Sequence, residues 1–342
     1  AEGKFIRAYA YTDLLKFFGE GALAGNMQGK GLPLQLTPFK GYNTGDVIPR
    51  SPNEDVYNQI ISDLQDAVSV LPDQQASDLQ TRSRATRGTA NALLARVYLY
   101  KRDYANAALA AKAVLDKTGI YALTSDLGRL FPMNPNGTAQ SLSSEYIFAF
   151  PVSQMQSSST AVNNNLGNGY FFKRSFWINP AFIQSFETGD LRVSQLMFKG
   201  DSIYNPDRFG DKTTAKFNNS NGRDNVPLIR LAEIMLIRAE ALARGGTLNQ
   251  EAIDLLNAVR SRSLPQAATF TMSDFQDNAA FLASVLDQRR YELAFEGFYR
   301  YDLIRTGQPL HNPDIPDNKK VLPIPQIEVD ISNGVIQQNE GY

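Results

Sequence analysis

The fold is decided by residues 87–114, which read RGTANALLARVYLYKRDYANAALAAKAV. The apolar residues of a first helix, predicted over 87–101, recur at helical spacing on one face: Ala90, Leu93, Leu94 and Val97. Asp103 is placed to cap a second helix, whose inward residues are Tyr104, Ala107, Ala111 and Val114. Only a few residues separate the two helices, so we expect them to lie antiparallel as neighbours.

This helix pair matches much of the tetratricopeptide spacing, in which small residues let two helices approach closely. The matching residues are Leu94, Ala95, Tyr98, Tyr104 and Ala107. Ala111 stands where that pattern usually has a large aromatic side chain, so the match is partial. The sequence therefore predicts a frame built from helix-turn-helix units.

Helical periodicity recurs elsewhere and predicts four such units in all. They span about 4–71 (with a loop at 21–50), 87–116, 229–263 and 273–305. The intervals between them are too irregular for a regular solenoid, so insertions must decorate one side of the frame. Capping boxes are predicted at Ser51 and at Thr247, and the tail 309–342 is expected to be extended.

The largest insertion, residues 131–225, differs in composition from the frame. It holds 12 Asn and 12 Ser between Asn134 and Asn225, and its one clear strand pattern is 145–150. Between 161 and 217 it holds 11 aromatic residues in 57, well above the 11% of the whole chain. We therefore predict a mainly all-α fold with a long, loop-rich, irregular insertion that carries a little β structure.

Aromatic rings in a polar, irregular segment favour a carbohydrate ligand, because ring faces stack on the C–H faces of sugars while amide and guanidinium groups bond to hydroxyls. The stacking candidates are Trp177, Tyr170, Phe172 and Tyr42. The polar candidates are Asn164, Asn168 and Arg174. The alternative is that these rings form a small core that anchors the insertion.

Composition excludes several functional classes. The 342 residues carry a net charge of −1, which gives no large field that would attract nucleic acid or anionic lipid. The absence of cysteine and the single histidine, His311, exclude thiol nucleophiles, Cys-ligated zinc and a His-based metal cluster within one chain. We expect no catalytic residue, no cofactor and no metal. A calcium ion at Asp207, Asp211, Asp224 and Asn225 is a minor alternative, since their spacing fits no known loop.

Two pairs of carboxylates suggest glycoside hydrolysis at first sight. Each pair shares a helix face: Glu233 with Glu240, and Glu292 with Glu296. Arginines lie beside them at helical spacing, namely Arg230, Arg238 and Arg289. Arg–carboxylate pairing between packed helices is the simpler interpretation, and it would lower the carboxylate pKa values, which is the wrong direction for a general acid.

Four stretches, by their order and spacing, resemble the SusD/RagB family of outer-membrane nutrient-uptake lipoproteins. They are RGTANALLARVYLY (87–100) with DYANAA (103–108), LIRLAEIMLIRAEAL (228–242) with LLNAVR (255–260), RRYELAFEG (289–297) with YDLIRTG (301–307), and LPIP (322–325) with QNEGY (338–342). Gln288 departs from the family's usual Glu, and Tyr299 from its frequent Arg. The resemblance covers essentially the whole chain.

The resemblance implies a single SusD-like domain over 1–342, with four tetratricopeptide-like units and a loop-rich region. It implies a non-enzymatic protein of the cell surface that captures oligosaccharides or polysaccharides and passes them to a SusC-like TonB-dependent porin. It also implies a preceding segment with a signal and a lipid-bearing cysteine, so that outer-membrane association would come through a lipid anchor outside this chain. Peptide cargo is compatible with the family. A tetratricopeptide scaffold that binds a protein or peptide, and less so a glycoside hydrolase, are the alternative functions.

Overall fold

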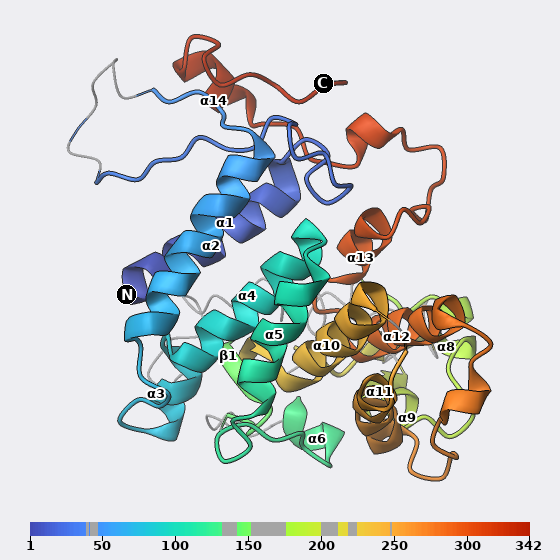
Figure 1. Ribbon diagram of the computed structural model, residues 1–342. Helices are drawn as coiled ribbons and strands as arrows, with labels where there is room; N and C mark the ends of the chain where they lie inside the picture. The colour runs from blue at the N-terminus through green and yellow to red at the C-terminus, as the bar shows by residue number, and fades with distance from the viewer. Residues whose placement is uncertain are drawn as a thin grey trace.

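The computed structural model describes residues 1–38, 41, 47–131, 142–151, 176–199, 211–217, 224–246 and 248–342. Within them, four pairs of neighbouring helices form the frame and follow one another across the molecule (Figure 1). The pairs are α1 (Glu2–Phe18) with α2 (Asn53–Val70), α4 (Arg87–Lys101) with α5 (Tyr104–Leu115), α10 (Leu231–Gly245) with α11 (Gln250–Ser263), and α12 (Asn278–Glu292) with α13 (Tyr299–Arg305). The predicted mainly all-α fold class is confirmed.

Short elements fill the connections. The helices among them are α3 (Asp78–Ser83), α6 (Leu127–Leu130), α8 (Pro180–Gln184), α9 (Leu191–Gln195) and α14 (Gln326–Ile331). Two 3-10 turns are η4 (Met272–Asp274) and η5 (Asp317–Lys319). No helix in the described part of the chain is both long and apolar enough to cross a bilayer.

The α4–α5 pair forms as its sequence predicts. Thr86 caps α4 by accepting a hydrogen bond from the backbone N–H of Thr89, and Asp103 caps α5 by accepting from Asn106. Between them Arg102 adopts a left-handed conformation (φ 65°), which reverses the chain within two residues. Ala111 is fully buried, so a small residue here lets the neighbouring helices come close. This pair packs on α2 and on α10 and thereby joins the first three units.

Two buried clusters form most of the core. The larger one joins α1, α2, α4 and α5 with one side of α10, and the smaller joins the other side of α10 with α11 and α12. Phe281 is fully buried in the smaller cluster. Because α10 contributes to both clusters, the units form one continuous frame rather than separate bodies.

Both predicted capping boxes are wrong, for local reasons. Pro52 occupies the N-cap of α2, and no side chain caps it. The adjacent Asn53 is instead fully buried and donates from Nδ2 to the carbonyls of Glu20 (2.9 Å) and Asn26 (2.7 Å), which ties the loop after α1 to α2. For α11 the cap is Asn249, which accepts from the N–H of Ala252. Thr247 lies outside the described residues.

Two short antiparallel sheets carry the β structure. Strand β1 (Tyr146–Phe150) pairs with β4 (Val226–Arg230), and β2 (Met197–Lys199) pairs with β3 (Lys212–Thr214). The strand predicted at 145–150 is confirmed. The prediction of helix from residue 229 is wrong, because Pro227 biases the preceding backbone toward the β region and β1 supplies a partner up to Arg230. The helix begins directly afterwards, at Leu231.

The C-terminal tail returns to the end of α1 (Figure 1). The N–H of Leu322 donates to the carbonyl of Phe17 (2.8 Å), and Asn339 Nδ2 donates to the carbonyl of Phe18 (3.0 Å). The tail is not extended throughout, since it contains η5 and α14. The structure therefore closes the chain on itself beside the loop that follows α1.

Candidate functional site

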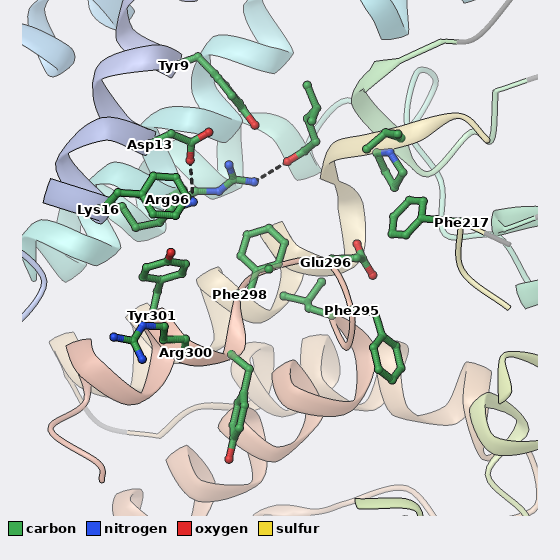
Figure 2. A pocket seen from close by; sticks show the side chains of 17 residues that line it. Tyr9, Asp13, Lys16, Arg96, Phe217, Phe295, Glu296, Phe298, Arg300 and Tyr301 are labelled. Atoms are coloured by element: carbon green, nitrogen blue, oxygen red, sulfur yellow. Dashed lines mark hydrogen bonds and ion pairs between the residues drawn. The ribbon is translucent and has the colours of Figure 1, made fainter. Parts of the chain in front are cut away.

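A groove of about 700 Å³ lies where α1, the start of β4 and the turn between α12 and α13 meet (Figure 2). We call it the α1–α13 groove. Its aromatic side chains are Tyr9, Phe17, Phe217, Phe295, Phe298, Tyr299 and Tyr301. Its charged side chains are Asp13, Lys16, Arg96, Glu296 and Arg300. In Figure 2 the polar groups of α1 lie at one end and Phe217 and Phe295 at the other.

The turn after α12 places two of these rings. Helix α12 ends at Glu292, so Glu292 and Glu296 do not share a helix face as predicted, because Phe295 (φ 67°) and Gly297 (φ 83°) both take left-handed conformations. A left-handed phenylalanine is costly, on the order of 1–2 kcal/mol, so it persists only where the surroundings fix it. The double reversal leads the chain into α13 and leaves Phe295 and Phe298 lining the groove.

At the polar end Lys16 is held by three neighbours. Its Nζ lies 2.7 Å from Asp13 Oδ1 and 4.7 Å from the ring centroids of both Phe17 and Tyr301. A cation over aromatic faces is attracted by their quadrupoles. Carboxylate, ammonium and ring are thereby fixed in one place, which provides hydrogen-bonding groups next to an apolar face.

Arg96 occupies the middle of the groove and is also fixed. It donates from Nε and Nη2 to Glu233 at 2.7 Å each and from Nη2 to the carbonyl of Leu228 at 2.8 Å. Burial would lower the pKa of Arg96, but Glu233 outweighs it and holds the pKa above the ordinary value. The guanidinium lies 5.1 Å from the ring of Phe298, and burial raises the pKa of Tyr9 to about 12. The Tyr9 phenol is therefore neutral at physiological pH.

Beneath the groove the predicted Arg–carboxylate pairing is confirmed, but the partners differ from the predicted ones. Glu292 and Glu296 pair with Arg230 at 2.6 and 2.8 Å. Burial would raise the pKa values of both carboxyls, and the surrounding cations lower them instead, that of Glu292 well below its ordinary range. Arginines that share a sequence neighbourhood with the carboxylates pair elsewhere: Arg238 with Glu251, and Arg289 with Asp302.

The first carboxylate pair is also held by arginines. Glu233 pairs with Arg96, and Glu240 accepts from Arg305 at 2.6 and 2.8 Å. Burial would raise the pKa of Glu240, but Arg305 outweighs it and lowers the pKa to about 2. All four carboxylates are thus members of structural ion pairs, and the lowered pKa values of Glu240, Glu292 and Glu296 leave these three with no proton to donate at neutral pH.

Of the residues predicted to bind glycan, the structure describes Trp177 alone. It is partly exposed and precedes Ile178, whose N–H donates to the carbonyl of Lys212 (2.8 Å) and holds this segment alongside β3. It does not line the α1–α13 groove. The other six candidates lie outside the described residues: Tyr170, Phe172, Tyr42, Asn164, Asn168 and Arg174. That set remains a prediction.

The groove itself was missed by sequence reasoning, although the sequence carried one signal of it. Residues 291–301, YELAFEGFYRY, hold five aromatic residues in 11 positions. Helical periodicity assigned them to a helix and its neighbour, and the reversal at Phe295 and Gly297 was not expected. Within the described ranges no cluster of three His, Cys, Asp or Glu residues is placed to hold a metal ion, and Asp207 lies outside them.

The sequence of the chain is similar to those of known proteins. Residues 192–318 match the SusD family, and residues 1–99 match a family described as "Starch-binding associating with outer membrane". SusD-like protein P2 of Formosa agariphila is 24% identical over the whole chain, which spans 74% of that protein. A SusD-like protein of Bacteroides ovatus is 25% identical over 89% of the chain, which spans 58% of that protein.

Solved structures agree. A SusD superfamily protein from Bacteroides thetaiotaomicron superposes with a TM-score of 0.79 at 25% identity, over 99% of this chain and 77% of that one. The chain belongs to the SusD/RagB family. A structure described as a laminarin-binding SusD-like protein has a TM-score of 0.73 at 23% identity, over 100% of this chain and 78% of that one, and shares the SusD-like fold. In this SusD/RagB chain the α1–α13 groove lies between the two matched segments, since Tyr9 belongs to the 1–99 match and Phe298 to the 192–318 match.

Proposed function

We propose that this chain is a glycan-binding protein of the cell surface, which captures oligosaccharides and hands them on unaltered to a SusC-like TonB-dependent transporter. The observation that carries the proposal is the α1–α13 groove, an aromatic-lined cavity with fixed polar groups in a SusD/RagB frame. The family description as starch-binding and the laminarin-binding relative support a saccharide as the ligand class.

The groove suits a sugar for physical reasons. Rings such as Phe298 and Tyr301 offer apolar faces, and the neutral phenol of Tyr9 both donates and accepts hydrogen bonds. Lys16 and Arg96 are held in place by Asp13 and Glu233 before any ligand arrives. Because these side chains are already ordered, binding costs little conformational entropy, and this raises the affinity for a polar ligand such as a saccharide.

The insertion supplies a second part of the proposed binding surface. Trp177 is partly exposed beside β3, as a stacking residue requires. Together with Tyr170, Phe172, Tyr42, Asn164, Asn168 and Arg174 it forms the set whose composition fits a sugar. We propose that these residues extend the contact beyond the groove.

Binding without catalysis is part of the same proposal. Glycoside hydrolysis needs a carboxylic acid that keeps its proton near neutral pH. The groove carboxylate Glu296 has a lowered pKa because Arg230 and Lys216 outweigh its burial, and both donate to it. A fluorescently labelled oligosaccharide incubated with the protein should be recovered intact. Cleavage by the wild-type protein that is absent in Glu296→Gln would refute the proposal that the protein binds without catalysis.

The test of binding is isothermal titration against a panel of laminari-, malto-, cello-, xylo- and manno-oligosaccharides. At least one series should bind, and Phe298→Ala and Trp177→Ala should each weaken it. Tyr342→Ala is the matched control, because this half-exposed ring lies on the tail, over Lys319. No heat with any saccharide would remove the proposed ligand class, and unchanged affinity in both variants would remove the proposed surface.

Location and partner need a separate experiment. We propose that a lipid anchor outside this chain holds the protein at the outer membrane, in line with the family description. Affinity purification from membranes of the native host should recover a TonB-dependent porin with the protein. Recovery of the protein in the soluble fraction without such a porin would contradict it.

A further inference from the structure

A second, smaller cleft lies between α12 and α13, on the other side of Tyr299 from the α1–α13 groove. Its volume is about 260 Å³, and its polar lining includes Asp287, Arg290, Tyr299 and Gln308. We call it the α12–α13 cleft. Tyr299 lines both cavities, so one ring separates them. The volume falls below the roughly 300–1,000 Å³ of sites for drug-sized ligands, which limits the occupant to something small.

Arg290 lies against two aromatic rings at this cleft, and no described residue accepts a hydrogen bond from it. Its guanidinium carbon lies 5.0 Å from the ring centroid of Phe182 and 4.9 Å from that of Tyr299. Among the residues that the structure describes, no carboxylate or carbonyl accepts a hydrogen bond from it, and its Nε is buried. The aromatic sandwich thus fixes a planar donor whose bonds within the described chain are unmade.

Asp287 is the complementary acceptor. It stands one helical turn before Arg290 on α12 and lines the same cleft. Within the described ranges it has no hydrogen-bond or ion-pair partner, and burial raises its pKa although Arg290 opposes this. Asp287 is an exposed residue, so a ligand in the cleft can reach its unpartnered carboxylate, which has unused capacity to accept hydrogen bonds.

Another carboxylate of the same cleft is, by contrast, fully paired. The next acidic residue along its wall, Asp302, accepts from Arg289 at 3.1 and 3.2 Å and from Arg305 at 2.7 Å. The same two helices therefore saturate one carboxylate with two arginines and leave another carboxylate and another arginine unpaired. Asp287 and Arg290 do not pair with each other either, so a bridging ligand can use both.

We infer that the α12–α13 cleft binds a single sugar residue, with Asp287 accepting from its hydroxyls, Arg290 donating to them and Tyr299 contacting its ring. The inference rests on the proposed function, since it names a subsite for the same class of ligand. Because Tyr299 also lines the α1–α13 groove, the residue in the cleft is the end or a branch of a glycan whose main chain lies in the groove. Sugar hydroxyl groups both donate and accept hydrogen bonds, so they can donate to the carboxylate of Asp287 and accept from the guanidinium of Arg290.

The experiment uses the full chain and titrates the same oligosaccharide panel, extended by branched forms and by the free monosaccharides. Asp287→Asn and Arg290→Gln should each lower the affinity for the best saccharide roughly tenfold, the effect of one lost hydrogen bond to a charged group. Asp254→Asn on α11 and Arg129→Gln on α6 are the matched controls, since both side chains are exposed and neither lines the cleft. Thermal unfolding of each variant separates loss of binding from loss of fold.

Each outcome decides between the two proposals. Weaker binding in the two cleft variants with unchanged controls supports the subsite. Wild-type affinity for every saccharide in both cleft variants overturns it and leaves glycan binding in the groove intact. Binding of free glycine that Asp287→Asn removes, with saccharide affinity unchanged, also overturns it, because the cleft would then hold a zwitterion. Absence of any saccharide binding to the wild-type chain refutes the proposed function itself.

Discussion

Arg230 Nη1 lies 2.6 Å from Glu292 Oε1, and each side chain is only 2% exposed. Arg230 ends β4 and Glu292 ends α12, so this pair ties the small sheet to the helical frame directly below the α1–α13 groove. Arg230 also contacts Glu145 at 2.8 Å and Glu296 at 2.8 Å. The floor of the groove is thus a buried ionic network whose members compensate one another.

Removing one carboxylate from this network should lower the free energy of unfolding, because the arginines that it neutralises stay buried. Glu292→Gln leaves Arg230 and Arg262 without their shared carboxylate in a buried site. Loss of one partner of a buried ion pair costs about 3–5 kcal/mol, because the remaining charge stays desolvated. Urea unfolding followed by circular dichroism should show a decrease in unfolding free energy of that order.

The control for this measurement is an exposed pair in the same protein. Lys112 and Asp116 are 51% and 57% exposed and lie one turn apart on the end of α5. Asp116→Asn should change the unfolding free energy by less than about 1 kcal/mol, since solvent screens such pairs. Equal losses in the two variants would mean that the network below the groove does not behave as a buried site.

The contribution of the buried Glu240–Arg305 ion pair to the unfolding free energy should depend on pH. Burial would raise the pKa of Glu240, but Arg305, with help from Arg289 and Arg244, lowers it from 4.5 to about 2. A carboxyl whose pKa is lower in the folded state stabilises the fold above pH 4.5 and loses that contribution as the pH falls toward 2. For this fully buried group the difference corresponds to about 3 kcal/mol.

Unfolding free energies of the wild type and Glu240→Gln, measured from pH 7 down to pH 2, test this. The gap between the two proteins should be constant above pH 4.5 and narrow progressively below it. Glu292 and Glu296 also titrate at low pH but are present in both proteins, so their effect cancels in the difference. A gap that does not change with pH would show that Glu240 titrates at its ordinary value.

The contact between tail and frame gives a third prediction. Asn339 is 2% exposed and donates from Nδ2 to the carbonyls of Phe18 (3.0 Å) and Leu322 (2.7 Å). Asn339→Ala leaves two acceptors without their donor, at a cost of about 1–3 kcal/mol. Hydrogen exchange should become faster in the tail from 321 onward, while Gln326→Ala, which loses only an exposed bond to Asp330, should leave it unchanged.

The helices could be read from the sequence because their signals are local. Asp103 caps α5 as predicted, since capping depends on residues a few positions apart. The ion-pair partners could not be read in this way. Arg96 lies 137 residues from Glu233, and helical spacing reports only residues that share a helix, so it pointed to Arg238 instead.

The groove was inaccessible to sequence reasoning for a similar reason. Tyr9 and Phe298 meet only because the frame brings α1 against the α12–α13 turn, and that turn depends on a left-handed Phe295 which no sequence preference predicts. The high aromatic content of the insertion led to the prediction of Trp177 as a glycan-binding residue, and Trp177 lies beside β3 and outside this groove. Composition thus favoured aromatic stacking as the kind of ligand contact, but it could not show where in the fold such a contact is formed.

Tyr301 distinguishes stacking from hydrogen bonding in the proposed glycan site. Its ring lines the groove 4.7 Å from Lys16 Nζ and 5.7 Å from the ring of Phe17, and burial raises its pKa to about 12. Tyr301→Ala should weaken oligosaccharide binding about tenfold, since an aromatic contact contributes roughly 0.5–1.5 kcal/mol beyond its area and removing the ring also frees Lys16. Tyr301→Phe keeps the ring face and should bind within about twofold of wild type. Titration calorimetry of both variants checks this, with melting temperatures to confirm folding. If the phenylalanine variant loses as much affinity as the alanine variant, the hydroxyl and not the ring face holds the sugar.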